Sequence, residues 1–204
     1  DDAAGITVSG LMGNTSEAYV LDGTFASFTV VLNSEPTDTV LIVVSSDNTY
    51  EGTVSQDSLI FTDSNWNILQ TVKITGVEDA PPSADGNQTY HIIIAAASST
   101  DVNYDGIDPS DKTLINSDND SPGITVYPVD ELITTEAGGT AAFNVKLNTL
   151  PDESVFIGIS SSKTDEGNID KSTLEFTPGN WSVDQAVTVT GVDDLDNDGN
   201  IGYS

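Results

Sequence analysis

The densest run of potential metal ligands is Asp193-Asp194-Leu195-Asp196-Asn197-Asp198-Gly199-Asn200. Carboxylate and amide oxygens suit a hard cation such as Ca²⁺, which takes about six to eight of them at roughly 2.3–2.6 Å. The spacing Asp194-x-Asp196-x-Asp198-Gly199 is similar to the start of an EF-hand loop. The flanking segments have strand patterns, whereas an EF-hand loop lies between two helices. The run therefore predicts a calcium site of a different kind.

The whole chain is strongly acidic, with 33 Asp and Glu residues against 5 basic residues and a formal charge of −28. This charge argues against nucleic acid or an anionic membrane surface as a partner, because both require basic patches, and it favours cations. The absence of Cys excludes disulfides and thiolate metal sites. No apolar run approaches the roughly 18 residues needed to span a bilayer. The composition is typical of an extracellular protein.

The chain repeats itself with a period of 115 residues. Residues 28–77 return without a gap at 143–192, and within them Asn65-Trp66 matches Asn180-Trp181. This period is the size of a whole domain rather than of a solenoid repeat. Tandem copies of one domain are typical of structural or binding arrays, because duplication supplies reach and spacing.

Alternating side-chain patterns predict β-strands in both copies. Ala26, Phe28, Val30 and Leu32 alternate with smaller or polar residues, and the pattern returns at 141–147. Further strands are expected at 40–44, 72–75, 90–97, 112–116, 155–159 and 187–190. Clusters of Gly, Pro, Asn and Asp between these runs predict turns, and no convincing amphipathic helix is found. About seven short strands per copy favour an immunoglobulin-like β-sandwich.

We therefore predict an all-β protein of two tandem sandwiches, the first over residues 1–120 and the second over 121–204. The boundary falls in Ser117-Asp118-Asn119-Asp120-Ser121-Pro122, a short linker that favours two rods laid end to end. The second copy ends after the counterpart of Tyr90 and so lacks its last two strands within this chain. We expect these strands to follow later in the polypeptide. The alternative is that another subunit donates them.

A combination of motifs supports a family resemblance. The motifs are Leu59…Phe61-Thr62…Asn65-Trp66…Gln70-Thr71-Val72…Thr75-Gly76-Val77-Glu78-Asp79, Asp85-Gly86-Asn87-Gln88-Thr89-Tyr90, Ser98-Ser99-Thr100-Asp101, Tyr104-Asp105-Gly106 and Asn116-Ser117-Asp118-Asn119-Asp120. Together they resemble the Calx-beta-like repeats of prokaryotic surface proteins and adhesins, over almost all of copy one and most of copy two. The resemblance implies an immunoglobulin-like sandwich that binds Ca²⁺ through acidic loops at one end, in stalks, fibres and adhesins.

The resemblance also implies which residues bind calcium, in the first bend, in two later loops and at the end of the last strand. They are Glu17, Asp47, Glu51, Glu78, Asp79, Asp118 and Asp120 in the first copy, and Glu136, Asp165, Glu166, Asp193, Asp194, Asp196 and Asp198 in the second. A sandwich brings these loops to one end, where the carboxylates repel each other without a cation. Copy one departs from the pattern at Ala80-Pro81-Pro82-Ser83, which leaves the number of ions open. The alternative is that the acids are ordinary solvated loop residues.

The first residues suggest an assembly. Asp1 and Asp2 open a segment that aligns with Asn119-Asp120, the end of a preceding junction. Head-to-tail neighbours, in one polypeptide or in a fibre of separate copies, could share these two acids with the acidic loops of a second-copy domain. We therefore expect a calcium-bridged stalk or filament.

Other candidate sites are interpreted as structural. His91 lies in a strand pattern without a repeated partner for a triad, and Trp66 and Trp181 fit packing at the sandwich edge better than a sugar platform. The paired carboxylates recur domain by domain in polar loops rather than in a cleft, and Gly-rich phosphate loops are absent. No enzymatic activity is expected.

The sequence thus predicts a secreted, calcium-binding structural repeat protein of the cell surface, with calcium stiffening domain or subunit junctions. The alternative hypothesis is a glycan- or surface-binding module of an adhesin or of a secreted enzyme. Exposed aromatic residues in a row on one face would favour that alternative.

Overall fold

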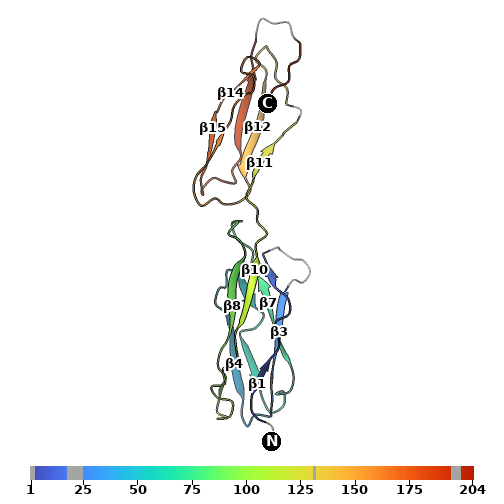
Figure 1. The fold of residues 1–204 in the computed structure, drawn as a ribbon, viewed down its shortest axis with the longest axis vertical. Helices are drawn as coiled ribbons and strands as arrows, with labels where there is room; N and C mark the ends of the chain where they lie inside the picture. The colour runs from blue at the N-terminus through green and yellow to red at the C-terminus, as the bar shows by residue number, and fades with distance from the viewer. Residues whose placement is uncertain (1–2, 18–24, 131, 194–198) are drawn as a thin grey trace. The chain divides into compact units, whose positions relative to one another are not determined.

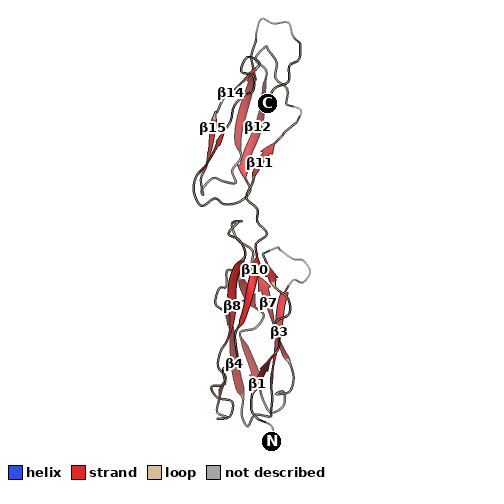
Figure 2. Ribbon diagram, viewed as in Figure 1, coloured by secondary structure: helices blue, strands red, loops and turns tan. Residues whose placement is uncertain are grey.

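The computed structural model describes residues 3–17, 25–130, 132–193 and 199–204, and all its regular elements are β-strands (Figure 1). No helix occurs in these ranges, which confirms the all-β fold class (Figure 2). None of the described elements is therefore a helix long and apolar enough to cross a membrane. The chain divides into two compact units, unit 1 with Asp1–Ala80 and Asp85–Asn119 and unit 2 with Pro81–Ala84 and Asp120–Ser204.

Unit 1 is built from two facing sheets. Its strands are β1 (Ile6–Val8), β2 (Thr15–Ser16), β3 (Phe25–Leu32), β4 (Val40–Ser46), β5 (Gly52–Val54), β6 (Ser58–Phe61), β7 (Gln70–Gly76), β8 (Gln88–Ile94), β9 (Ser98–Ser99) and β10 (Lys112–Ser117). One sheet has the order β1-β3-β7-β5, and the other has the order β2-β10-β8-β4-β6, with β9 beside β4. Strands β2 and β10 are parallel, so both leave the sheet at the same end. This end of unit 1 carries the candidate site.

The core of unit 1 follows from the period of two in its strands. In β3 the residues Ala26, Phe28, Val30 and Leu32 are at most 2% exposed, whereas the residues between them are not fully buried. Side chains from the facing sheet complete the core, mainly from β4, β6, β8 and β10. Because alternate side chains of a strand point to opposite faces, this pattern alone buries one face of each sheet.

Unit 2 repeats much of this arrangement. Its strands are β11 (Ile124–Tyr127), β12 (Thr140–Leu147), β13 (Val155–Gly158), β14 (Gly167–Ile169), β15 (Thr173–Phe176) and β16 (Gln185–Gly191). One sheet has the order β11-β12-β16-β14, which matches β1-β3-β7-β5, and the second sheet pairs β13 with β15. Even the register is the same, since Phe143 faces Val187 as Phe28 faces Val72. The fully buried core of unit 2 is smaller.

The repeated Asn-Trp…Gln motif protects the edge of a sheet. Asn65 and Gln70 both donate side-chain N–H groups to the carbonyl oxygen of Ile60 in the edge strand β6, at 3.1 and 2.8 Å. Asn180 and Gln185 do the same for Glu175 in β15, at 3.3 and 2.7 Å. A carbonyl on a sheet edge would otherwise be available to pair with another chain. This explains why the spacing of the Asn and the Gln recurs in both copies.

Candidate metal centre

The site in unit 1 is centred on Glu17, which directly follows β2. Its backbone N–H donates to the carbonyl oxygen of Ser117 at 3.0 Å and so extends the parallel pairing of β2 with β10 by one residue. This contact fixes the side chain of Glu17 beside the segment that follows β10. Carboxylate oxygens of Glu17 and Asp118 lie within 4.8 Å of each other.

Glu17 is an unusual carboxylate because it is buried without compensation. The residue is 1% exposed, and neither carboxylate oxygen has a hydrogen-bond partner among the described residues. Burial, followed by the negative charges of neighbouring acids, raises the pKa of Glu17 from 4.5 to about 7. The contributing acids are Asp118, Asp79, Asp85 and Glu51, in this order. A carboxylate in this position needs either a proton or a cation.

Asp79 and Asp85 approach Glu17 from the segment that joins β7 to β8. One carboxylate oxygen from each of Asp79, Asp85 and Glu17 lies within 4.8 Å of the other two. Asp85 is exposed, Asp79 is half-buried and Glu17 is buried, so the site extends from the carboxylate of Glu17 to the solvent. Three chain segments that are distant in sequence, namely the end of β2, the β7–β8 connection and the end of β10, therefore meet at one point.

Glu51 and Asn116 form the inner wall of the site. Glu51 is 6% exposed, and its Oε2 accepts a hydrogen bond of 3.2 Å from the side-chain amide of Asn116. Burial raises the pKa of Glu51, the hydrogen bond from Asn116 lowers it, and the charges of Asp85 and Asp79 raise it further. The amide of Asn116 also donates to the carbonyl oxygen of Val77 at 3.0 Å. Its Oδ1 is buried without a hydrogen-bond partner in the described part of the chain.

Two glycines allow the segments to approach this closely. A Cβ on Gly76 would lie 2.4 Å from the carbonyl oxygen of Ser16 and 2.5 Å from Oδ1 of Asn116, so any side chain there would push β7 away from β2. Gly86 adopts a φ of 79°, in the left-handed region that favours glycine. From this conformation its N–H donates to Oδ2 of Asp118 at 2.8 Å. The carboxylate of Asp118 is thereby held near the site.

The arrangement fits a hard divalent cation. Two ligand oxygens on opposite sides of a Ca²⁺ ion, each at about 2.4 Å, are about 4.8 Å apart. Carboxylate oxygens of Glu17, Asp79 and Asp85 all lie within this distance of one another. All the nearby donors are oxygens, and the chain has no Cys, so a soft or thiolate-bound metal does not match. The two lysines of unit 1 are placed over aromatic rings, Lys73 at 4.5 Å from the centroid of Phe25 and Lys112 at 6.0 Å from that of Phe28.

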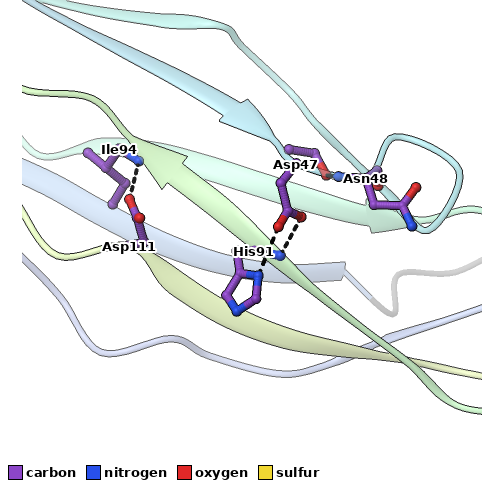
Figure 3. Close-up of polar contacts among 6 residues, drawn as sticks. Asp47, Asn48, His91, Ile94 and Asp111 are labelled. Carbon is purple, nitrogen blue, oxygen red and sulfur yellow. Dashed lines mark hydrogen bonds and ion pairs between the residues drawn. The ribbon is translucent and has the colours of Figure 1, made fainter.

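Asp47 and Glu78, two of the predicted ligands of the first copy, lie outside this cluster. Asp47 is exposed, directly after β4, and contacts His91 (Figure 3). Its Oδ1 accepts the backbone N–H of His91 at 2.7 Å, and its Oδ2 lies 2.8 Å from Nδ1 of the same residue. These hydrogen bonds lower the pKa of Asp47. Glu78 is exposed and accepts a hydrogen bond from Asn119 at 3.1 Å. Asp120 is half-buried and belongs to unit 2. Asp1 and Asp2 lie outside the described residues.

The predicted ligands of the second copy form no comparable cluster in the described part of unit 2. Glu136, Asp165 and Asp193 are exposed, and Glu166 is half-buried. Asp194, Asp196 and Asp198 lie outside the described ranges. Glu17 is buried because β10 covers it, whereas the described residues of unit 2 include no strand that pairs with Thr134 and its neighbours in this way. This accounts for the exposure of Glu136.

Two residues of the site were missed by the sequence analysis. Asp85 and Asn116 were both quoted as parts of motifs, but neither was included among the ligands. The repeat contained a signal for the first of them, because Asp85-Gly86-Asn87 aligns with Asp198-Gly199-Asn200, and Asp198 was predicted as a ligand. The motif Asn116-Ser117-Asp118-Asn119-Asp120 included Asn116 but did not show its role, because that role depends on the close approach of Gly76.

Comparison with known proteins gives distant similarities of structure. No protein-family model and no curated protein matches the chain. Among solved structures, the chain is similar to CBD12 from CALX1.2, with 13% identity over 94% of this chain and 75% of that chain and a TM-score of 0.36. It is also similar to a protein of unknown function from Porphyromonas gingivalis, with 10% identity over 92% and 83% and a TM-score of 0.31. A third similarity is to domains 5–6 of the S-layer protein SbsC, with 17% identity over 99% and 88% and a TM-score of 0.27.

At these identities and TM-scores, the similarities assign neither a family nor an activity. The function proposed below therefore rests on the geometry of the site.

Proposed function

We propose that unit 1 binds Ca²⁺ through Glu17, Asp79, Asp85 and Asp118, and that the chain is an extracellular structural repeat protein without enzymatic activity. The single observation that supports the cation site most strongly is the buried carboxylate of Glu17, both of whose oxygens have no hydrogen-bond partner among the described residues. Exposed acids are common in an acidic protein, but a carboxylate that is 1% exposed is not.

The electrostatic cost of the site supports a bound cation. Removing an ionised carboxylate from water is expensive unless it is paired, and here the nearest charged groups have the same sign. Protonation relieves the cost below about pH 7, since this is the value to which the pKa of Glu17 is raised. Above this pH a divalent cation is the remaining means of compensation, and it would also reduce the repulsion among the surrounding acids.

The chemistry of the donors favours Ca²⁺ over other biological cations. The four acids and the unpartnered Oδ1 of Asn116 offer only oxygen ligands. Mg²⁺ requires a smaller, nearly octahedral shell and retains several waters, which suits a dense set of carboxylates less well. Zn²⁺ prefers nitrogen and sulfur, and the only His of the chain is His91, whose Nδ1 contacts Asp47 instead.

A cation at this point would have a structural role, because it would hold together the ends of three segments that are distant in sequence. The end of β2, the β7–β8 connection and the end of β10 would be tied into one rigid end of the sandwich. Together with the tandem repeat and the charge of −28, this supports a calcium-stabilised stalk or fibre at the cell surface. Head-to-tail assembly and ion-stiffened junctions remain predictions, tested by sedimentation and small-angle X-ray scattering in Ca²⁺ and in chelator.

Isothermal titration calorimetry of the full chain with CaCl₂ at pH 8 tests the site. We expect saturable binding with a Kd of about 10 µM or below, the range of sensor-type protein sites, and weaker binding of Mg²⁺. Glu17→Gln and Asp85→Asn should remove this binding event. The matched controls are Glu136→Gln and Asp47→Asn, which change acids outside the cluster and should leave it intact. Equal binding by Glu17→Gln and the unmodified chain would overturn the proposal.

A further inference from the structure

One outer face of unit 1 is apolar. In the sheet β2-β10-β8-β4-β6 every second side chain enters the core, so the residues between them lie on the opposite side of the sheet. On three adjacent strands these outer residues are aliphatic, and together we call them the aliphatic face: Leu41 and Val43 of β4, Ile60 of β6 and Ile93 of β8. Val43 and Ile60 are 46% and 51% exposed, and the other two are half-buried.

The aliphatic face is continuous across the three strands. Ile60 lies directly opposite Leu41 in the pairing of β6 with β4. Ile93 lies directly opposite Ser45, the next outer residue of β4 after Val43. Opposite residues of an antiparallel pair have Cβ atoms only about 4.5–5.5 Å apart. The exposed side chains therefore form one surface, whereas single exposed apolar residues are normal and would need no explanation.

The fold does not require this surface. The residues of unit 2 at the positions of Leu41, Val43 and Ile60 follow 115 residues later and are Phe156, Gly158 and Glu175. Their pairing is equivalent, since Phe156 faces Glu175 as Leu41 faces Ile60. The same sandwich positions thus accept a glycine and a charged residue in the second copy. The aliphatic residues of unit 1 are not explained by packing of the core.

The aliphatic face is also free of acidic residues. Strands β4, β6 and β8 contain none, although the chain has 33 and a formal charge of −28. Asp47 directly follows β4, and its carboxylate contacts His91 (Figure 3). Two chains of this charge repel each other wherever acidic surfaces meet. On the aliphatic face two copies can meet without opposing carboxylates, whereas a cationic partner would find its attraction on the acidic surfaces.

We propose that the aliphatic face of unit 1 is a self-association surface, and that its occupant is the same face of a second copy of this chain. The contact packs two sheets face to face about a two-fold axis, so that one patch meets itself. Pairing through the edge of β6 is not the mode, because Asn65 and Gln70 already donate to the carbonyl oxygen of Ile60. The contact joins chains side by side and does not depend on the cation site of unit 1.

Sedimentation equilibrium of the full chain in chelator tests the association. We expect a reversible dimer with a Kd between about 10 µM and 1 mM, as suits a small interface. The dimer should be stronger in about 500 mM NaCl than in about 20 mM NaCl, because salt screens the repulsion between the two acidic chains and leaves the apolar contact intact. A contact made by ion pairs would weaken instead. A monomer at every concentration and salt level overturns the proposal.

Val43→Lys and Ile60→Lys locate the contact. Each should weaken the dimer at least about 10-fold, because a two-fold interface loses the apolar contact of both copies and must bury a charge. Each change also makes the chain less acidic, so repulsion between whole chains predicts the opposite effect. The matched control is Phe156→Lys, at the 65% exposed counterpart of Leu41 in unit 2. Equal weakening by the control overturns the proposal.

Thiol labelling of Ser45→Cys identifies the occupant without disturbing the apolar residues. The chain has no Cys, so this variant carries one thiol, beside Ile93 on the aliphatic face. Its labelling should slow as the protein concentration rises. Thr71→Cys, at an exposed position of β7 in the other sheet, should show no such change. Slow labelling at every concentration would show that the same chain covers the face, and fast labelling at every concentration would show that nothing does. Either result overturns the proposal.

Discussion

Calcium should reverse the order of stability of the Glu17→Gln variant and the unmodified chain. The side chain keeps its shape but loses the charge that burial and four neighbouring acids penalise. In chelator at pH 8 we therefore expect the variant to be more stable than the unmodified chain. In Ca²⁺ we expect it to be less stable, because the central ligand of the proposed site is gone.

The magnitudes follow from the structure. A pKa raised from 4.5 to about 7 corresponds to about 3 kcal/mol of destabilisation of folded unit 1 once Glu17 is ionised. The amide of Gln leaves buried polar hydrogens without partners, which costs about 1–3 kcal/mol. The net gain in chelator is therefore about 1 kcal/mol, or about 4 °C in the Tm of unit 1. For the unmodified chain, free Ca²⁺ at 100 times Kd adds about 2.7 kcal/mol, and for the variant it adds nearly nothing.

The assay can be confined to unit 1, because the chain has two tryptophans, Trp66 in unit 1 and Trp181 in unit 2. In a Trp181→Phe background, urea unfolding followed by Trp66 fluorescence reports unit 1. The matched control is Glu136→Gln, which makes the same chemical change at the exposed counterpart in unit 2. It should leave unit 1 unchanged in both conditions.

Two results would refute the reasoning. If Glu17→Gln destabilises unit 1 by several kcal/mol in chelator, the charge of Glu17 does not destabilise the folded state, and the argument from burial and neighbouring acids is wrong. If Ca²⁺ stabilises the variant and the unmodified chain equally, Glu17 is not a ligand. In either case the site would have to be placed elsewhere.

Three further outcomes are expected. In chelator, the free energy of unfolding of unit 1 should fall as the pH rises from 4.5 to 7, because Glu17 keeps its proton in the folded state up to about pH 7 but loses it near 4.5 when unfolded. Urea titrations at four pH values measure this fall, and an equal fall with pH in Glu17→Gln would contradict the prediction. Gly76→Ala should destabilise unit 1 by about 1–3 kcal/mol and weaken Ca²⁺ binding, because the added Cβ collides with Ser16 and Asn116. The control Gly10→Ala places its Cβ where nothing lies within 4 Å, and calorimetry compares unfolding and Ca²⁺ binding of the two variants. Replacing Asn65 and Gln70 together by Ala should expose the edge carbonyl of β6 and increase self-association in sedimentation experiments, and an unchanged monomer would show that these amides do not protect the edge.

The strands were largely predictable, because their signal is local. The expected strands at 40–44 and 112–116 correspond to β4 and β10, whose bounds extend by one or two residues. The prediction at 90–97 starts two residues late and ends three residues beyond β8. Strand ends depend on where hydrogen bonding stops. At the end of β8, the carboxylate of Asp111 accepts the N–H of Ile94 at 2.8 Å, which no alternation pattern reveals (Figure 3).

The candidate site was only partly predictable. The family resemblance implied Glu17, Glu51, Asp79 and Asp118, but it gave Asp47 the same weight, although the carboxylate of Asp47 binds His91. Sequence shows that a carboxylate is in a loop, but it does not show which way the side chain points or what it meets. Glu17 and Glu136 occupy similar positions in the two copies, yet one is 1% exposed and the other is exposed.

By itself, the sequence determined the all-β class, the tandem repeat and the strongly acidic character of the chain, because alternation, self-similarity and net charge are properties of the chain alone. The tertiary structure decided which acids converge. The parallel pairing of β2 with β10, the close approach at Gly76 and the turn at Gly86 bring carboxylates about 60 to 100 residues apart within reach of one ion.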